Sequence, residues 1–166
     1  NQTGMLLLDY ICSQRVKHDK MPADPVMVKT IVTMDMGEQI ATHYGLRTIN
    51  VLTGFKFIGE QIGFLEAKGE ESRYIFGFEE SYGYMMGDYV RDKDAVTASM
   101  MAAEMAAYYY DRGMTLIDAI DELYKKYGFY SEETVNLFMY GVDGLGEMRA
   151  LMASLRQTCL LYTSPS

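Results

Sequence analysis

Short β-branched runs that alternate with helical segments constrain the fold of this chain most strongly. The strand-like runs are VMVKTIVT, LRTINVL and SRYIFGF, at residues 26–33, 46–52 and 72–78. The segments between them carry apolar residues at helical spacing and end at Gly45 and Gly69, and glycine is a common C-terminal cap. Strands that alternate with helices in this way predict an α/β domain with a mainly parallel sheet.

Further helices are predicted on both sides of this central region. Apolar periodicity favours helices over residues 4–20, 95–112, 116–127 and 145–157, and TVNLFMYG at 134–141 has the composition of another strand. Helices before, between and after the strands can cover both faces of one sheet. We therefore expect a three-layer α/β/α domain with a mainly parallel, mixed sheet.

The composition limits the partners of the chain. It has 166 residues, of which 49% are hydrophobic, and this is enough for a packed core. The formal net charge of -8 argues against nucleic acid and against an anionic membrane surface as partners, because both require a basic face. No apolar run approaches the roughly 20 residues of a membrane span. The two cysteines, Cys12 and Cys159, form neither a disulfide framework nor a metal-binding spacing, so a reducing, cytoplasmic setting is expected.

Two polar loops follow the carboxyl ends of predicted strands, where ligands of α/β folds bind. TGFK at 53–56 follows one strand, and EES at 79–81 follows another. Side chains alternate along a strand, so we expect Glu79 and Ser81 to contact a ligand and Glu80 to point the other way. The alternative is that a glutamate of this loop caps a neighbouring helix.

A third polar segment, RDKD at 91–94, directly precedes the long helix predicted from residue 95. Asp92 or Asp94 can cap this helix, and Lys93 can bind a phosphate or donate a proton. From the spacing alone, a capping segment with mutual ion pairs is the favoured interpretation.

In the TGFK loop, Gly54 allows a close backbone approach and Thr53 supplies a hydroxyl.

Three segments, in this order and spacing, resemble the alpha-D-phosphohexomutases, and the bacterial phosphoglucomutases most of all. They are TGFKFIGEQI, FGFEESYGY and RDKDAV. The resemblance implies that residues 1–25 are the end of the family's second domain and a linker, and that 26–130 form its sugar-binding third domain. Residues 131–158 would be the first strand and helix of the fourth domain. The last eight residues, 159–166, resemble a translated sequencing adapter, and we expect them to be a scar that takes no part in the fold.

The resemblance also implies a role for each site residue. Glu79 and Ser81 match the family's sugar-recognition loop and would bind sugar hydroxyls in both orientations of the substrate. Thr53 and Gly54 match a turn that approaches the sugar. Lys93 would contact the substrate and support proton transfer, as the catalytic residue of this part of the enzyme. No metal ligand is expected in this chain.

The activity implied by the resemblance is that of an isomerase of carbohydrate metabolism that works by phosphoryl transfer. A phosphoserine and Mg2+, both held outside these residues, would interconvert a hexose 1-phosphate and a hexose 6-phosphate, with a sugar bisphosphate as intermediate and activator. The partners would be the phosphosugar and the other domains of the same chain, and this piece alone would be inactive. Alternatives are a phosphopentomutase, a sugar-bisphosphate synthase, or a non-catalytic domain that binds sugar phosphates.

Overall fold

The structure, a computed structural model, describes residues 1–133 and 136–157. It divides into two compact units, Asn1–Ser131 and Glu132–Ser166. Among the described residues, the first unit contains the sheet and five α-helices, and the second contains one further helix. Within the described residues, no helix is both long enough and apolar enough to cross a membrane.

The predicted elements of the first unit are all present, within a few residues of their expected ends. The elements follow one another along the chain in this order: α1 Gln2–Lys17, β1 Val26–Thr30, α2 Met36–His43, β2 Arg47–Val51, α3 Phe55–Glu66, η1 Glu71–Arg73, β3 Tyr74–Phe78, β4 Tyr84–Met85, α4 Ala95–Tyr110 and α5 Leu116–Tyr127. Gly45 and Gly69 have φ angles of 72° and 68°, as expected for glycines that follow a helix. The two-residue strand β4 lies inside the loop predicted at 79–94 and was not predicted.

The four strands form one mixed sheet in the order β2-β1-β3-β4. Strand β1 runs parallel to both neighbours, with Val28 opposite Ile49 of β2 and Gly77 of β3. Strand β4 is antiparallel to β3. Because the three long strands are parallel, their carboxyl ends lie at one edge of the sheet, and the loops that contain the predicted site residues start there.

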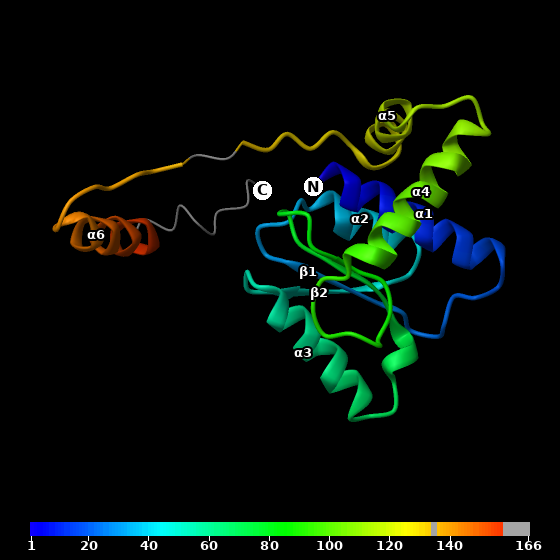
Figure 1. The fold of residues 1–166 in the computed structure, drawn as a ribbon, viewed down its shortest axis with the longest axis horizontal. Coiled ribbons are helices and arrows are strands. Elements are labelled where there is room, and N and C mark those ends of the chain that lie inside the picture. The colour runs from blue at the N-terminus through cyan, green and yellow to red at the C-terminus, as the bar shows by residue number, and fades with distance from the viewer. Residues whose placement is uncertain (134–135, 158–166) are drawn as a thin grey trace. The chain divides into compact units, whose positions relative to one another are not determined.

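Helices cover both faces of this sheet, which confirms the three-layer arrangement (Figure 1). Helix α3 packs on one face, where Ile58 and Ile62 belong to the same buried cluster as Val26 and Val28 of the central strand. Helices α1, α2, α4 and α5 pack on the other face and form the larger core. The alternation of side chains along the strands gives each face its own set of buried residues.

Helix α1 belongs to the same compact unit as the sheet, although residues 1–25 were expected to end a preceding domain. Residues Gly4–Cys12 are buried, and the helix packs against α2, α4, α5 and β3. A Cβ atom at Gly4 would stand 2.7 Å from the ring of Phe78, so the helix lies directly on the sheet. Helix α1 is therefore part of the compact unit that holds the sheet.

The second unit contains helix α6, Gly144–Gln157, where a helix was predicted from residue 145. The strand predicted at 134–141 is not formed over residues 136–140, which have no regular structure. Residues 134–135 of that prediction, and the predicted scar at 159–166, lie outside the described residues.

Candidate functional site at the carboxyl edge of the sheet

Glu79 is a buried carboxylate at the carboxyl end of β3. It is 8% exposed, and its backbone N–H donates a hydrogen bond of 3.0 Å to the carbonyl oxygen of Gly83, which closes the EES loop into a tight turn. A Cβ atom at Gly83 would stand 2.6 Å from Oε1 of Glu79 and 2.8 Å from its Cγ. The glycine is therefore needed to leave room for the carboxylate.

The electrostatic surroundings of Glu79 suit a carboxylate that accepts hydrogen bonds. Burial raises the pKa of Glu79 above its ordinary value, whereas the positive charge of Lys93 and a hydrogen bond from Ser81 act to lower that pKa. Glu79 and Ser81 thus lie together, as predicted. The strand ends at Phe78, so a turn and not strand alternation brings them together.

Lys93 is held as an ammonium group beside this carboxylate. Its Nζ donates a hydrogen bond of 3.0 Å to Oδ1 of Asp92, and this bond raises the pKa of Lys93. Hydrogen bonds from the backbone and side chain of Lys93 lower the pKa of Asp92 in turn. Asp94 caps α4, because its Oδ1 accepts hydrogen bonds from the backbone N–H groups of Val96 and Thr97. The predicted capping role of RDKD is therefore confirmed, and it leaves Lys93 half exposed.

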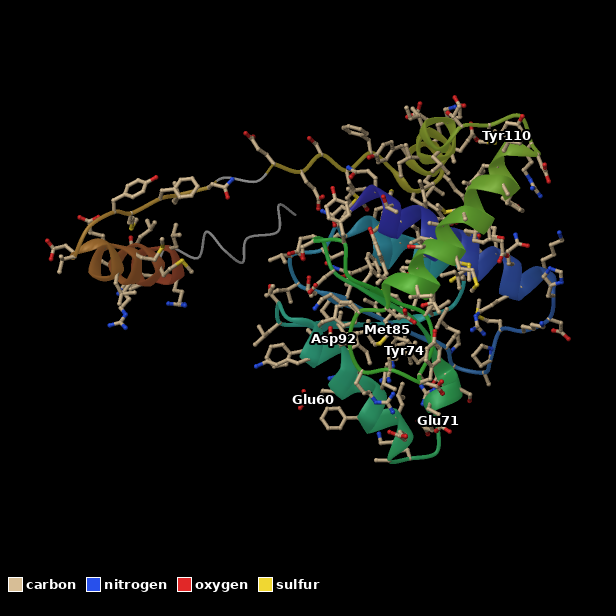
Figure 2. The ribbon with its side chains drawn as sticks, viewed as in Figure 1. Glu60, Glu71, Tyr74, Met85, Asp92 and Tyr110 are labelled. Carbon is tan, nitrogen blue, oxygen red and sulfur yellow. The ribbon has the colours of Figure 1, made fainter. Side chains whose placement is uncertain are left out.

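The RDKD segment is docked on α3 by a close backbone contact. A Cβ atom at Gly59 would stand 2.4 Å from the carbonyl oxygen of Arg91, so only glycine allows this approach. The guanidinium of Arg91 donates to Oε2 of Glu66 at 2.7 Å, further along the same helix. Asp92, the next residue, lies beside the start of α3 (Figure 2). Helix α3 thus fixes the position of Lys93.

The TGFK loop meets the same lysine at the start of α3. Gly54 has a φ angle of 127°, which other residues rarely adopt, and it precedes the first helical residue, Phe55. The ring of Phe55 is buried and lies 5.4 Å from Nζ of Lys93, within the range of a cation–π contact. Thr53 is exposed beside this turn. The predicted residues of all three loops therefore gather at one edge of the sheet.

A buried lysine that was not predicted stabilises the neighbouring loop. Lys29 is 1% exposed, and its Nζ donates hydrogen bonds of 2.9 Å to the carbonyl oxygen of Thr33 and to Oδ1 of Asp35. Glu38 of α2 lies 3.4 Å from the same Nζ. These contacts fix the turn between β1 and α2. The sequence feature that could have indicated this buried lysine is that it is the single charged residue in the apolar strand VMVKT.

Glu80 connects the EES loop to the central strand. Its Oε2 accepts a hydrogen bond of 3.1 Å from the hydroxyl of Thr30 at the end of β1. This bond attaches the EES loop to the central strand and helps to hold Glu79 in place. Within residues 1–133 and 136–157, no group of three His, Cys, Asp or Glu side chains could hold a metal ion.

Fold and site together define a class of protein. It is a three-layer α/β domain that presents a buried carboxylate and a fixed ammonium group at its carboxyl edge, which suits a ligand with both hydroxyls and negative charge. The family model described as phosphoglucomutase/phosphomannomutase, alpha/beta/alpha domain III, matches residues 1–127. The chain therefore belongs to the phosphoglucomutase/phosphomannomutase family.

Individual relatives agree with this membership. A phosphoglucomutase from Staphylococcus haemolyticus (strain JCSC1435) is 30% identical over 157 residues, and one from Staphylococcus aureus (strain bovine RF122 / ET3-1) is 32% identical over 156 residues. The matches cover 95% and 94% of this chain but only 27% of each relative, so the chain spans about a quarter of their length. The solved structure of Paramecium parafusin (pp63, a phosphoglucomutase) in its open form superposes on this chain with a TM-score of 0.55 at 18% sequence identity. The superposition covers 76% of this chain and 21% of parafusin, and it shows that the two share a fold.

Proposed function

We propose that this chain is the sugar-recognising part of an enzyme that interconverts hexose 1-phosphate and hexose 6-phosphate through a bisphosphorylated sugar. The observation that carries the proposal is a buried carboxylate, Glu79, that lies close enough to Lys93 at the carboxyl edge for the positive charge to act on it. Family membership and the phosphoglucomutase relatives support the class of reaction. The chain spans about a quarter of those relatives, so the complete activity needs parts that they have and this chain lacks.

Glu79 would accept hydrogen bonds from two neighbouring hydroxyls of the sugar. A carboxylate offers two oxygens to donors, and charge-assisted hydrogen bonds are stronger than neutral ones. Ser81 and Thr53 would add hydroxyl contacts, and Gly54 would let the backbone approach the ring. The bisphosphorylated sugar must reverse its orientation in the site between the two phosphoryl transfers. A site that accepts pairs of hydroxyls can hold the sugar in both orientations.

Lys93 would donate a hydrogen bond to the reacting end of the sugar. Its raised pKa keeps it protonated at neutral pH, so it supplies a proton and a positive charge and does not act as a base. Asp92 orients the ammonium group, and the contact of Arg91 with Gly59 of α3 fixes the segment. The charge of Lys93 also helps to keep Glu79 ionised beside it.

The phosphoryl donor, Mg2+ and the sugar bisphosphate activator would be held by residues that this chain does not contain. When bound there, Mg2+ would neutralise charge on the transferring phosphoryl group. The residues described here would bind and orient the sugar. We therefore expect the 166-residue chain to bind sugar phosphates weakly and to show no mutase activity.

Titration of the chain with glucose 1-phosphate, followed by amide resonances in NMR spectra, tests the proposal. Because the chain supplies part of a site, we expect a dissociation constant on the order of 1 mM. The shifts should concentrate at residues 53–54, 79–83 and 91–94. An absence of shifts at these positions up to about 20 mM ligand would reject sugar recognition by this edge.

Two glutamate variants make this experiment specific. Glu79→Ala should weaken binding roughly tenfold or more, because hydrogen bonds to a charged group contribute about 1.5–3 kcal/mol. Glu80→Ala is the matched control and should have a smaller effect, since Glu80 contacts Thr30. Parallel titrations with mannose and ribose phosphates would then rank the substrates.

A further inference from the structure

The EES loop contains a strained backbone position at Tyr82. The φ angle of Tyr82 is 62°, in the left-handed region. Among the described residues, the other non-glycine residues with a positive φ angle are Asp19 and Asp24, and aspartate adopts this conformation comparatively easily. A bulky residue such as tyrosine seldom does, and strain of this kind concentrates at ligand-binding sites. The conformation of Tyr82 therefore points to a function of its side chain.

The ring of Tyr82 contributes little to the packing of the first unit. Tyr82 is 79% exposed, so a glycine at this position would remove the strain with little loss of buried surface. The turn itself is required, because the hydrogen bond of 3.0 Å from the N–H of Glu79 to the carbonyl oxygen of Gly83 closes it. The fold thus explains the turn but not the tyrosine within it.

Tyr82 lies where a ligand would reach Glu79. Glu79 and Gly83 are buried, whereas Ser81 and Tyr82 are the exposed residues of the turn. A ligand approaches the buried carboxylate from solvent, so it meets these two residues. Both neighbours of Tyr82 lie against Glu79: Ser81 donates a hydrogen bond to it, and a Cβ atom at Gly83 would stand 2.6 Å from its Oε1.

Tyr82 also lines a hollow of about 220 Å³ at this edge of the domain. Tyr84 of β4 and Ala95, the first residue of α4, line the same hollow. Ala95 directly follows the RDKD segment, so the ring reaches from the EES loop toward the segment that carries Lys93. The hollow leaves room for a ligand group beside the ring.

We propose that Tyr82 is a specificity-determining residue whose ring stacks on the C–H face of a pyranose sugar while Glu79 binds the sugar hydroxyls. This proposal rests on the function proposed above. The face of an aromatic ring is negative and the C–H groups of a sugar carry a small positive charge, so the two attract each other as apolar surface is buried. The hydroxyls lie around the rim of a pyranose and remain free for Glu79.

A stacking contact suits two requirements of the proposed reaction. It has no donor or acceptor direction, so the same ring can hold the sugar before and after the sugar reverses its orientation. A six-membered pyranose ring also offers a broader and flatter C–H face than the puckered five-membered ring of a ribose phosphate. Tyr82 should therefore favour hexose phosphates over pentose phosphates.

Three variants separate the ring from the strain. Tyr82→Phe keeps both, Tyr82→Ala removes the ring and keeps the strain, and Tyr82→Gly removes both. Tyr82→Gly should melt about 2–4 °C higher than Tyr82→Ala, because only glycine adopts the positive φ angle without strain. Equal melting temperatures of these two variants would overturn the strain from which the proposal starts.

NMR titrations of the chain test the contact with the sugar. Tyr82→Gly should bind glucose 1-phosphate about three- to tenfold more weakly than the wild type, as expected for the loss of one aromatic contact, and Tyr82→Phe should bind like the wild type. The affinity for ribose 1-phosphate should change by less than about twofold. Tyr110→Ala is the matched control and should change neither affinity, because it removes a tyrosine that is 81% exposed at the other end of α4 (Figure 2).

Saturation-transfer difference spectra report whether the ring contacts the sugar directly. When the aromatic protons of the protein are irradiated, saturation should pass to the C–H protons of glucose 1-phosphate in the wild type and in Tyr82→Phe. This transfer should fall in Tyr82→Gly and stay unchanged in Tyr110→Ala. A residue that only shapes the turn would not produce this pattern.

Each outcome supports or overturns the proposal. Weaker binding of glucose 1-phosphate with reduced saturation transfer in Tyr82→Gly supports it. Unchanged binding in Tyr82→Gly, together with weaker binding in Glu79→Ala, would overturn the role of Tyr82 and leave the proposed function standing. Equal weakening for both sugar phosphates would show that the ring shapes the turn and does not select the sugar, which also overturns the proposal. A wild-type chain that binds neither sugar phosphate would reject the proposed function and this proposal with it.

Discussion

Replacing Gly59 by alanine should displace Lys93 without changing any of the residues that we propose to contact the sugar. The new Cβ atom would stand 2.4 Å from the carbonyl oxygen of Arg91, at least 0.6 Å closer than such contacts occur. The obstructing atom is backbone, so the RDKD segment must move as a whole. Overpacking of this kind costs about 1–3 kcal/mol, against a gain of about 0.5–1 kcal/mol from replacing glycine in a helix.

Gly63→Ala provides the matched control, because it lies one turn further along α3 and a Cβ atom there would meet nothing within 4 Å. The gain in helix propensity is common to both variants. The difference between their free energies of unfolding in urea should therefore report the contact with Arg91, at about 1–3 kcal/mol. In NMR titrations with glucose 1-phosphate, Gly59→Ala should bind roughly tenfold more weakly than Gly63→Ala, which is what loss of one hydrogen bond to a charged group predicts. Equal stability and equal affinity of the two variants would refute the docking of Lys93 by α3.

Three further predictions concern carboxylates of the first unit. Gly83→Ala should push the Glu79 carboxylate aside and weaken sugar binding about tenfold. The free energy of unfolding should change by less than about 2 kcal/mol. Unchanged affinity in the titration would contradict the role of Glu79. Asp9→Ala should destabilise the chain by about 2–4 kcal/mol in urea, because the partly buried hydroxyls of Tyr44 and Tyr127 lose their acceptor, and Asp9→Asn should lose less. Glu79→Gln should remove a pH dependence, because folding raises the pKa of Glu79. As pH rises from 4.5 through that raised value, the wild type should lose stability relative to Glu79→Gln, while its affinity for sugar rises. Parallel pH curves for the two proteins would contradict this.

The order of helices and strands in the first unit could be predicted because local signals agree with the fold. Apolar periodicity, β-branched runs and the glycines at 45 and 69 place the elements within a few residues of their observed ends. Strand β4 escaped prediction because it has two residues, too few for a periodic pattern. The strand predicted at 134–141 depended on composition alone, and residues 136–140 have no regular structure.

The place of α1 could not be derived from local pattern. The run MLLLDYIC is apolar on several sides, which indicates that the helix is buried but not which elements bury it. The structure answers this with specific contacts: Gly4 lies against Phe78, and Asp9 accepts hydrogen bonds from Tyr44 and Tyr127. These partners are between 35 and 118 residues away in sequence, so only the folded chain reveals them.

The sequence predicted where the loops of the candidate site lie in the fold, but not the tertiary contacts that hold them. The rule that ligands bind at the carboxyl ends of parallel strands located the loops of Thr53 and Glu79, whereas Lys93 was singled out by its place before α4 and by the family resemblance. The burial of Glu79 and the contact of Arg91 with Gly59 depend on tertiary packing that no spacing encodes. Lys29 was missed because a lysine inside a strand gives no sign of the acidic partners that fold around it.

The most direct test of the central proposal is the rate at which the complete protein that contains this chain converts glucose 1-phosphate to glucose 6-phosphate. Glu79→Ala should lower kcat/KM by roughly ten- to hundredfold, and Glu80→Ala should lower it less. Absence of conversion by the wild type, or an unchanged kcat/KM in a folded Glu79→Ala variant, would contradict the assignment of sugar recognition to this carboxylate.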